Sequence, residues 1–190
     1  MRITGGEHGG RTLLVPKSDA IRPTQDRVRE ALFSMLQCEV PGSDFLDLFA
    51  GTGAVGLEAI SRGAARVTFV EMNVRHIDVL RRNIAAITPS AATDVVRADA
   101  YRYLASYAGA GFSVAFADPP YALGEEKGYA SVLATLAERG VVRPGGVFVA
   151  EMTAVQKAES TPGWTLLRDR TYGKTRLCVW RRDGEAAHDD

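Results

Sequence analysis

Apolar and polar residues alternate along this chain in a pattern that predicts strands and helices in regular succession. Strand patterns run over 45–49, 66–70, 94–98 and 112–117, and helix patterns over 55–62, 74–87, 101–107 and about 128–139. A fifth strand is expected over 147–151, after a turn at Arg143-Pro144-Gly145-Gly146. Strands that alternate with helices at this interval indicate a doubly wound α/β sheet with parallel pairing and right-handed crossovers.

The two ends of the chain depart from this alternation. Residues 164–170 and 175–181 flank Tyr172-Gly173-Lys174 and predict an antiparallel hairpin. Residues 1–23 are rich in glycine and basic residues, which favours an extended arm or short β-hairpin around 11–15 rather than a separate domain. Thr24 is expected to N-cap a helix ending near Pro41-Gly42. We therefore divide the chain into an arm (1–23), one α/β domain (24–182) and an acidic tail (183–190), which we expect to be disordered.

A glycine turn joins the first strand of the domain to its first crossover helix. It reads Asp47-Leu48-Phe49-Ala50-Gly51-Thr52-Gly53-Ala54-Val55-Gly56. Glycine accepts positive φ and has no Cβ, so Gly51 and Gly53 allow a tight turn and a close approach of backbone to ligand. With Glu71 downstream the pattern also fits a dinucleotide fingerprint. The turn predicts a bound small molecule and does not identify it.

Four successive strand patterns end on or near an acidic residue. These residues are Asp47, Glu71, Asp99 and Asp118. The carboxyl ends of parallel strands line one crevice, so we expect the four acids to surround a single ligand. Carboxylates repel a pyrophosphate but suit ribose hydroxyls, an ammonium and a sulfonium, all of which S-adenosylmethionine carries. The alternative is that one or two of the acids only cap the following helix.

The fourth strand runs into Asp118-Pro119-Pro120-Tyr121, which we expect to form a rigid loop at the crevice mouth. An aromatic amine is a weak nucleophile because its lone pair is delocalised into the ring. The Asp118 carboxylate and the Pro119 carbonyl can accept hydrogen bonds from both of its N–H groups and favour a pyramidal nitrogen. Tyr121 can stack on an extruded base. The sequence therefore predicts catalysis on a nucleobase amine, against the alternative of a plain exposed turn.

Composition and charge indicate what kind of protein carries this chemistry and where it acts. The 190 residues have a formal net charge of zero and 46% hydrophobic residues, ordinary for one globular domain. Residues 164–182 nevertheless hold six basic residues against one acid, a basic face that the acidic tail hides from the sum. Cys38 and Cys178 form no metal or redox motif and are expected to be core thiols. The first residues contain no apolar leader pattern, so we expect a cytoplasmic protein that contacts no membrane.

Taken together, these motifs resemble a known family. The opening Arg2-Ile3-Thr4-Gly5-Gly6, the segment from Arg22 to Phe33, the glycine turn, Glu71-Met72, Asp99-Ala100 and the D-P-P-Y tetrapeptide are similar to the bacterial 16S ribosomal RNA guanine(966)-N2 methyltransferase family. The resemblance covers almost the full length. It implies a Rossmann-like class I methyltransferase fold with a seven-stranded, mostly parallel sheet and an antiparallel C-terminal hairpin.

The resemblance also implies roles for individual residues. S-adenosylmethionine, converted to S-adenosylhomocysteine, would be held by Asp47, Phe49, Gly51, Gly53, Glu71, Met72, Asp99, Ala100 and Thr24. The target guanine would be held by Asp118, Pro119 and Tyr121. Arg11, Arg22, Asp26 and Arg27 would shape the RNA side of the pocket. No metal is required, because the sulfonium is already an activated methyl donor, and the partner would be 16S ribosomal RNA in a partly or fully assembled small subunit, bound by a monomer.

Three other interpretations remain open from the sequence. An N6-adenine DNA methyltransferase shares the D-P-P-Y tetrapeptide, although no stretch of the chain is left over for a target-recognition domain. An RNA-binding assembly factor could keep the fold without catalysis. A nicotinamide oxidoreductase could use the glycine turn, and it is the weakest of the three because of the surrounding acids.

Overall fold

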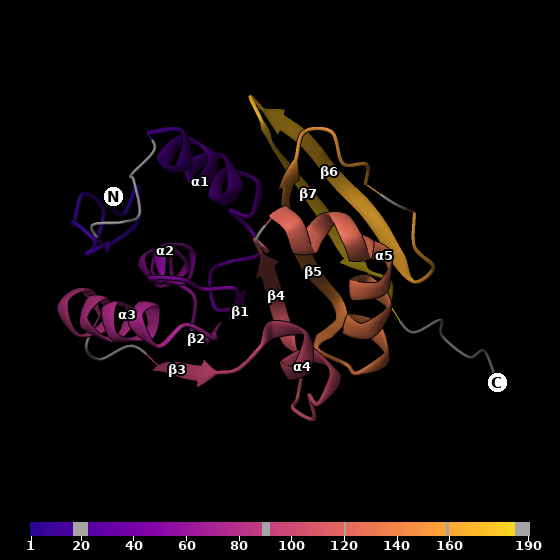
Figure 1. Ribbon diagram of the computed structural model, residues 1–190, viewed down its shortest axis with the longest axis horizontal. Coiled ribbons are helices and arrows are strands. Elements are labelled where there is room, and N and C mark those ends of the chain that lie inside the picture. The colour runs from indigo at the N-terminus through magenta and orange to yellow at the C-terminus, as the bar shows by residue number, and fades with distance from the viewer. Residues whose placement is uncertain (17–22, 89–91, 120, 159, 185–190) are drawn as a thin grey trace.

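The computed structural model describes residues 1–16, 23–88, 92–119, 121–158 and 160–184, apart from the side chains of 23–25 and 121–128 (Figure 1). The helices are α1 (Pro23–Met35), α2 (Ala54–Ser61), α3 (Val74–Ile87), α4 (Ala100–Ala105) and α5 (Tyr121–Glu138). The strands are β1 (Asp44–Leu48), β2 (Arg66–Glu71), β3 (Ala92–Arg97), β4 (Phe112–Ala117), β5 (Val142–Thr153), β6 (Trp164–Tyr172) and β7 (Thr175–Arg182). Arg22, Pro120 and the acidic tail from Glu185 lie outside the described residues.

The strands of the described chain form one seven-stranded sheet in the order β3-β2-β1-β4-β5-β7-β6. The first five strands pair in parallel, and β7 pairs antiparallel with both β5 and β6. Gly173 takes a φ of 62° in the two-residue turn between β6 and β7, as expected where glycine occupies the first central position of a hairpin turn. The predicted fold is therefore confirmed, including the antiparallel C-terminal hairpin.

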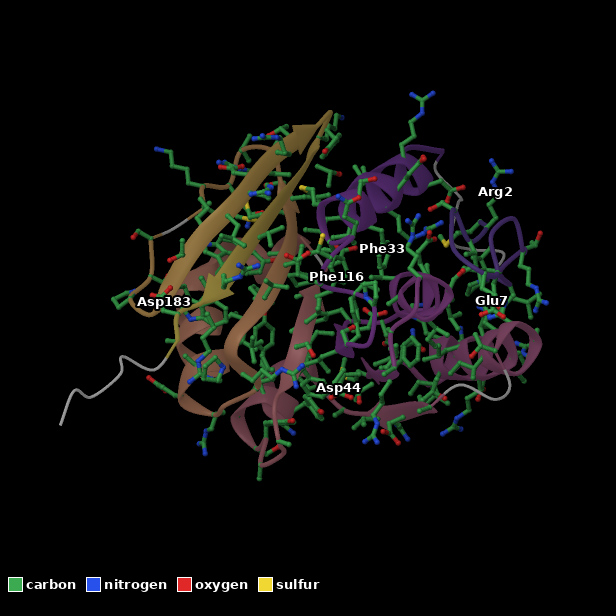
Figure 2. The ribbon with its side chains drawn as sticks, turned by 180° about the vertical axis from the view of Figure 1, so that it is seen from behind. Arg2, Glu7, Phe33, Asp44, Phe116 and Asp183 are labelled. Atoms are coloured by element: carbon green, nitrogen blue, oxygen red, sulfur yellow. The ribbon has the colours of Figure 1, made fainter. Side chains whose placement is uncertain are left out.

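Helices cover both faces of the sheet, with α1, α2 and α3 on one side and α4 and α5 on the other (Figure 1). Because side chains alternate across a strand, odd and even positions enter different cores. Phe45, Phe116 and Val149 pack toward α1 and α2, whereas Leu46, Ala117 and Ala150 pack toward α4 and α5. Figure 2 shows Phe33 of α1 beside Phe116 of β4 in the first of these layers.

The N-terminal arm folds back as a loose hairpin rather than as paired strands. Arg2 and Thr12 form an isolated antiparallel bridge, and Ile3 N–H donates to the Arg11 carbonyl at 2.9 Å. Buried Glu58 of α2 accepts hydrogen bonds from Thr4 N–H at 2.8 Å and from the Arg29 guanidinium at 3.0 Å. The arm is thereby tied to α1 and α2 at one end of the sheet, away from the C-terminal hairpin (Figures 1 and 2).

Two helix starts differ from the sequence expectation. Helix α1 begins at Pro23, so Thr24 lies within the first turn and is not the N-cap; the fixed φ of proline suits the first helical position. Helix α5 begins at Tyr121 rather than near residue 128. Gly124 and Gly128 lower helix propensity in this stretch, which is why the sequence pattern predicted a later start. Tyr121 thus starts a helix instead of extending a loop.

Two further expectations are wrong. Arg143-Pro144-Gly145-Gly146 lies inside β5, where the pairing with β4 jumps from Phe112 opposite Val142 to Val114 opposite Val147. The extra residues form a bulge, which Gly145 permits with a φ of 78°. Cys38 is exposed, and only Cys178 is a buried thiol, because Cys38 follows the end of α1 and lies outside the apolar face of that helix.

Candidate functional site

A cavity of about 370 Å³ opens at the carboxyl ends of β1, β4 and β5, on the face of the sheet covered by α1 and α2. Its walls come from the arm, α1, the glycine turn, the start of α2, α3 and the ends of three strands. They are formed by Met1, Val15, Arg29, Leu32, Asp47, Phe49, Ala50, Gly51, Thr52, Ala54, Val55, His76, Phe116, Asp118 and Glu151. The fold thus brings Asp47, Phe49, Gly51 and Asp118 into one cavity, as predicted.

The glycine turn holds three residues at positive φ. Gly51 has a φ of 54° and Gly53 has a φ of 87°, which glycine adopts readily because it has no Cβ. A Cβ added to Gly53 would lie 2.3 Å from Leu80 Cδ1, whereas one added to Gly51 would meet no protein atom within 4 Å. Gly53 therefore packs against the protein core, where a larger residue would not fit, and Gly51 lines the cavity.

Phe49 is the one described non-glycine residue with a positive φ, at 62°. Left-handed backbone is costly for a bulky side chain and persists where the surrounding structure holds it. The ring packs edge-on against Tyr101 of α4, with centroids 5.7 Å apart. The sequence placed Phe49 at the cofactor but gave no sign of this strain.

Asp47 combines a structural contact with a position in the cavity wall. Its side chain is buried, and Oδ2 accepts a hydrogen bond from Gly56 N–H at 2.8 Å in the first turn of α2. Burial raises the pKa of Asp47 to about 7, and the nearby Asp118 and Glu71 carboxyls act in the same direction. A cation in the cavity would favour the ionised form of this carboxyl.

The start of α2 contributes backbone donors. Ala54 and Val55 line the cavity, and first-turn N–H groups of a helix have no intrahelical acceptor. Gly53 at the N-cap offers no side-chain bond, and no acceptor contacts either N–H group within the described chain. Such a helix start favours a bound carboxylate. The donors and Asp47 together fit the two charged ends of an amino acid group.

Asp118 and Glu151 stand side by side at the ends of neighbouring strands. Ala117 of β4 lies opposite Ala150 of β5, so the next residues, Asp118 and Glu151, fall on the same face of the sheet. Partial loss of water raises the pKa of Asp118 to about 6 although its surface is open to the cavity. Burial, reinforced by Asp118, raises the pKa of Glu151 to about 8.

Neither of these two carboxyl groups accepts a hydrogen bond or forms an ion pair within the described residues. Arg29 lines the same cavity, but its guanidinium donates to Glu58 and to Asp26, the latter at 2.9 Å. Glu151 was missed from the sequence. The rule that selected the other acids, a carboxyl at a strand end, also applies to the end of the strand predicted over 147–151.

Glu71 borders the cavity from below the glycine turn. Its Oε2 accepts a hydrogen bond from Gly51 N–H and its Oε1 one from Asn73 N–H, both at 2.7 Å. His76 Nδ1 lies 3.9 Å from Glu71 Oε2 and its ring lines the cavity. No motif in the sequence indicated His76. Its one recognisable feature is its position in the first turn of α3, the helix that follows β2. Met72 is largely exposed beside this site.

Asp99 and Ala100 are not among the residues that line the cavity. Asp99 N-caps α4 by accepting a hydrogen bond from Arg102 N–H at 3.0 Å, and Ala100 is buried as the first residue of that helix. Of the four acids expected to surround a single ligand, Asp47 and Asp118 line this cavity and Glu71 borders it, and the contact of all four with one ligand stays a prediction. The hydrogen bond that the structure gives the Asp99 side chain is that of a helix cap, which was the alternative role considered for these acids.

The remaining predicted residues lie mostly outside the cavity wall. Arg11 donates to the carbonyls of Ala86 at 3.4 Å and Ile87 at 3.1 Å, at the end of α3. Asp26 pairs with Arg29, and Arg27 is exposed in the groove between the arm and α1. Pro119 is buried. Arg22 and the side chains of Thr24 and Tyr121 lie outside the description, so their roles stay predictions.

The donor set fits S-adenosylmethionine on chemical grounds. The free N–H groups at the start of α2 suit its carboxylate, and Asp47 suits its ammonium. Gly51 leaves space beside the turn for the atoms that follow. Within the described chain no cluster of three or more His, Cys, Asp or Glu could hold a metal ion, and no described helix has the length and apolar character to cross a membrane.

Known proteins resemble this chain over nearly its whole length. Residues 1–181 match the family described as "Conserved hypothetical protein 95". Ribosomal RNA small subunit methyltransferase D of Escherichia coli K12 is 34% identical, covering 100% of this chain and 93% of the relative. YlbH of Bacillus subtilis 168 is 33% identical, covering 97% and 100%. The solved structure of Escherichia coli yhhF matches with a TM-score of 0.84 and 33% identity, covering 97% of this chain and 99% of that one.

Proposed function

Because this chain belongs to the family described as conserved hypothetical protein 95, we propose that it methylates the exocyclic N2 of a guanine in small-subunit ribosomal RNA. S-adenosylmethionine is the methyl donor in this proposal, and guanine 966 of 16S RNA is the target that the family resemblance implies. The name of the 34% identical relative from Escherichia coli supports the RNA class. It does not specify the base or the atom, which rest on the family resemblance and on the D-P-P-Y tetrapeptide.

The observation that carries the proposal is the cavity shared by Asp118 and the glycine turn. A carboxyl at the end of β4, with no hydrogen-bond partner of its own within the described residues, lines the same cavity as Gly51 and the start of α2. This arrangement seats an electrophile on one side and an amine on the other. Methyl transfer needs both reacting atoms in line and close together.

Asp118 is the acceptor that orients the amine. Its carboxylate takes a hydrogen bond from one N–H of guanine N2, and the Pro119 carbonyl takes the other, so that the nitrogen lone pair points at the donor. S-adenosylmethionine, when bound, supplies an electrophilic methyl group on a positive sulfur. As the N–C bond forms and the S–C bond breaks, Asp118 receives the proton that the methylated nitrogen gives up.

The surroundings hold the two partners in place. Asp47 and the start of α2 bind the amino acid end of the donor, and Glu71 binds the ribose while fixing the Gly51 amide. Met72, Asp99 and Ala100 flank the adenine, and Tyr121 stacks on the guanine. Arg11, Arg22, Thr24, Asp26 and Arg27 lie on the RNA side. The chain acts as a cytoplasmic monomer on an assembled or partly assembled small subunit.

Methyl transfer from labelled S-adenosylmethionine to three substrates tests this proposal. Small ribosomal subunits lacking the modification, their extracted RNA and duplex DNA are compared, and the modified base is identified by mass. Label on guanine N2 in the ribosomal substrate is the expected result. Label only on adenine of DNA would replace the target by that of an N6-adenine methyltransferase, and no transfer at all would favour a non-catalytic assembly factor.

A further inference from the structure

The pair formed by Asp118 and Glu151 exceeds what methyl transfer to an amine requires. One carboxylate and the Pro119 carbonyl account for the two N–H bonds of the amine, and this leaves Glu151 without a role. Its carboxyl nevertheless lies in the cavity wall, beside Asp118 and on the same face of the sheet. Burying an acid without a hydrogen-bond partner is costly, so the position calls for a ligand.

Strand register fixes the distance between these two acids. Neighbouring strands lie about 4.8 Å apart, so in-register residues at adjacent strand ends present their side chains as a row. The Tyr129 hydroxyl of α5 donates to the Glu151 backbone carbonyl at 3.1 Å and anchors this end of β5. The geometry therefore offers two acceptor groups on adjacent strands and on one face of the sheet, so that both side chains can converge on neighbouring donors of one flat ring.

Guanine carries a matching pair of donors. Its Watson–Crick edge presents the N2 amine next to the N1–H group, whereas the ring nitrogen beside the amine of adenine is an acceptor. A carboxylate accepts hydrogen bonds from donors and repels an acceptor lone pair. With Asp118 on the N2 amine, the neighbouring acceptor faces N1.

We propose that Glu151 accepts a hydrogen bond from guanine N1–H and thereby selects guanine over bases whose ring nitrogen beside the amine lacks a hydrogen. This inference rests on the proposed function and assigns a specificity residue within the same cavity. Asp118 orients the reacting amine, and Glu151 reads the adjacent ring atom. The Asp118 carboxyl contributes to the raised pKa of Glu151, which is a further sign that the two groups lie close together in the free protein.

RNA with 2-aminopurine at the target position tests the assignment. This base keeps the amine at the same ring position, but its N1 is an acceptor. A site built to bind an N–H group rejects an analogue lacking it, so at about pH 8.5, where Glu151 is mostly ionised, kcat/KM of the wild-type protein should be at least about 100-fold lower for 2-aminopurine than for guanine. In Glu151→Gln the amide can donate to N1 of 2-aminopurine, and the ratio should fall by about tenfold or more.

Glu138→Gln is the matched control, since it makes the same chemical change at the exposed end of α5. The fluorescence of 2-aminopurine reports binding independently of activity, and Glu151→Gln should bind this RNA more tightly than the wild-type protein does. Equal wild-type transfer to both bases, or an unchanged ratio in Glu151→Gln, would overturn the inference and leave the methyltransferase intact. Absence of wild-type transfer to guanine would overturn the proposed function itself.

Discussion

The two halves of the crevice use their acids differently. In the first half, around the ends of β4 and β5, the carboxyls of Asp118 and Glu151 have no hydrogen-bond partner within the described residues, and burial raises their pKa. In the second half, around the ends of β2 and β3, Glu71 and Asp99 accept hydrogen bonds from backbone N–H groups. The carboxyls without a partner can accept hydrogen bonds from a ligand. The carboxyls of Glu71 and Asp99 instead stabilise the backbone conformation through the N–H groups that they bind.

Replacing Asp118 should give the largest effect. Asp118→Asn keeps the shape and one acceptor oxygen but cannot take up the proton that the methylated nitrogen gives up, so the rate of methyl transfer should fall by about 100-fold or more. Affinity for S-adenosylmethionine should stay close to that of the wild-type protein, as measured by calorimetry. An active Asp118→Asn would contradict the assigned role, and a parallel loss of cofactor binding would move Asp118 from the base to the cofactor.

The glycine turn allows a matched pair of substitutions. Gly53→Ala places a methyl group 2.3 Å from Leu80 Cδ1 at a φ of 87°, and strain with overpacking should lower the free energy of unfolding by about 3 kcal/mol. Gly51→Ala meets no protein atom, so only the left-handed backbone costs about 1 kcal/mol. Urea unfolding measures both values. Equal losses would show that Leu80 adjusts and that backbone strain alone matters.

Substitution of Glu71 tests the role of the acids that accept backbone hydrogen bonds. In Glu71→Gln one side-chain oxygen becomes an N–H donor, so either Gly51 N–H or Asn73 N–H loses its acceptor. A lost partner of this kind costs about 1–3 kcal/mol, which should weaken binding of S-adenosylmethionine by at least about tenfold while the rate at saturating cofactor is kept. Binding is measured by calorimetry and the rate by label transfer. A lower saturated rate with normal affinity would place Glu71 at the chemical step instead.

The smallest effect is a pH dependence of ligand stabilisation. Burial raises the pKa of Asp47 to about 7 and that of Glu151 to about 8, so near pH 6 the fold holds protons that the unfolded chain has lost. These two groups make the ligand-free fold less stable as the pH rises from about 4 to 8. A bound cation favours the ionised carboxyls, so S-adenosylmethionine should raise the Tm more at about pH 7.5 than at about pH 5.5.

Asp47→Asn provides the control for this measurement, because it removes one of the titrating groups and should reduce the difference between the two pH values. The amide nitrogen can turn toward the cavity while the oxygen keeps the bond from Gly56 N–H. A ligand-induced rise in Tm that is the same at both pH values in the wild-type protein would show that these carboxyls do not contact the positive part of the ligand.

Local patterns predicted most of the fold. Apolar spacing located α3 at its observed bounds, Val74–Ile87, and β4 at Phe112–Ala117, because α3 buries one face along its length and β4 is buried on both faces of the sheet. The prediction was wrong at the start of α5, where Gly124 and Gly128 lower the helix propensity but the helix already begins at Tyr121. A bulge inside β5 looks like a turn in sequence, since glycine and proline favour both.

The candidate site was predictable in part for the same reason. Asp47, Gly51 and Asp118 stand at strand ends within recognisable motifs, and all three line the cavity. Arg11 shows that residue type alone does not identify a binding partner. Its positive charge suggested a contact with RNA, but its guanidinium donates to the last carbonyls of α3. His76 had no motif and entered the cavity only through the packing of α3.

The sequence by itself determined the succession of strands and helices, the glycine turn and the tetrapeptide at Asp118, because each depends on residues close together in the chain. Only the tertiary structure decided which acids share a cavity. Strand order and register are set by long-range pairing, which placed Glu151 beside Asp118 and left Asp99 as the cap of α4. Periodicity tells which side chains are buried, but the neighbour of each strand is fixed only when the whole sheet closes its core.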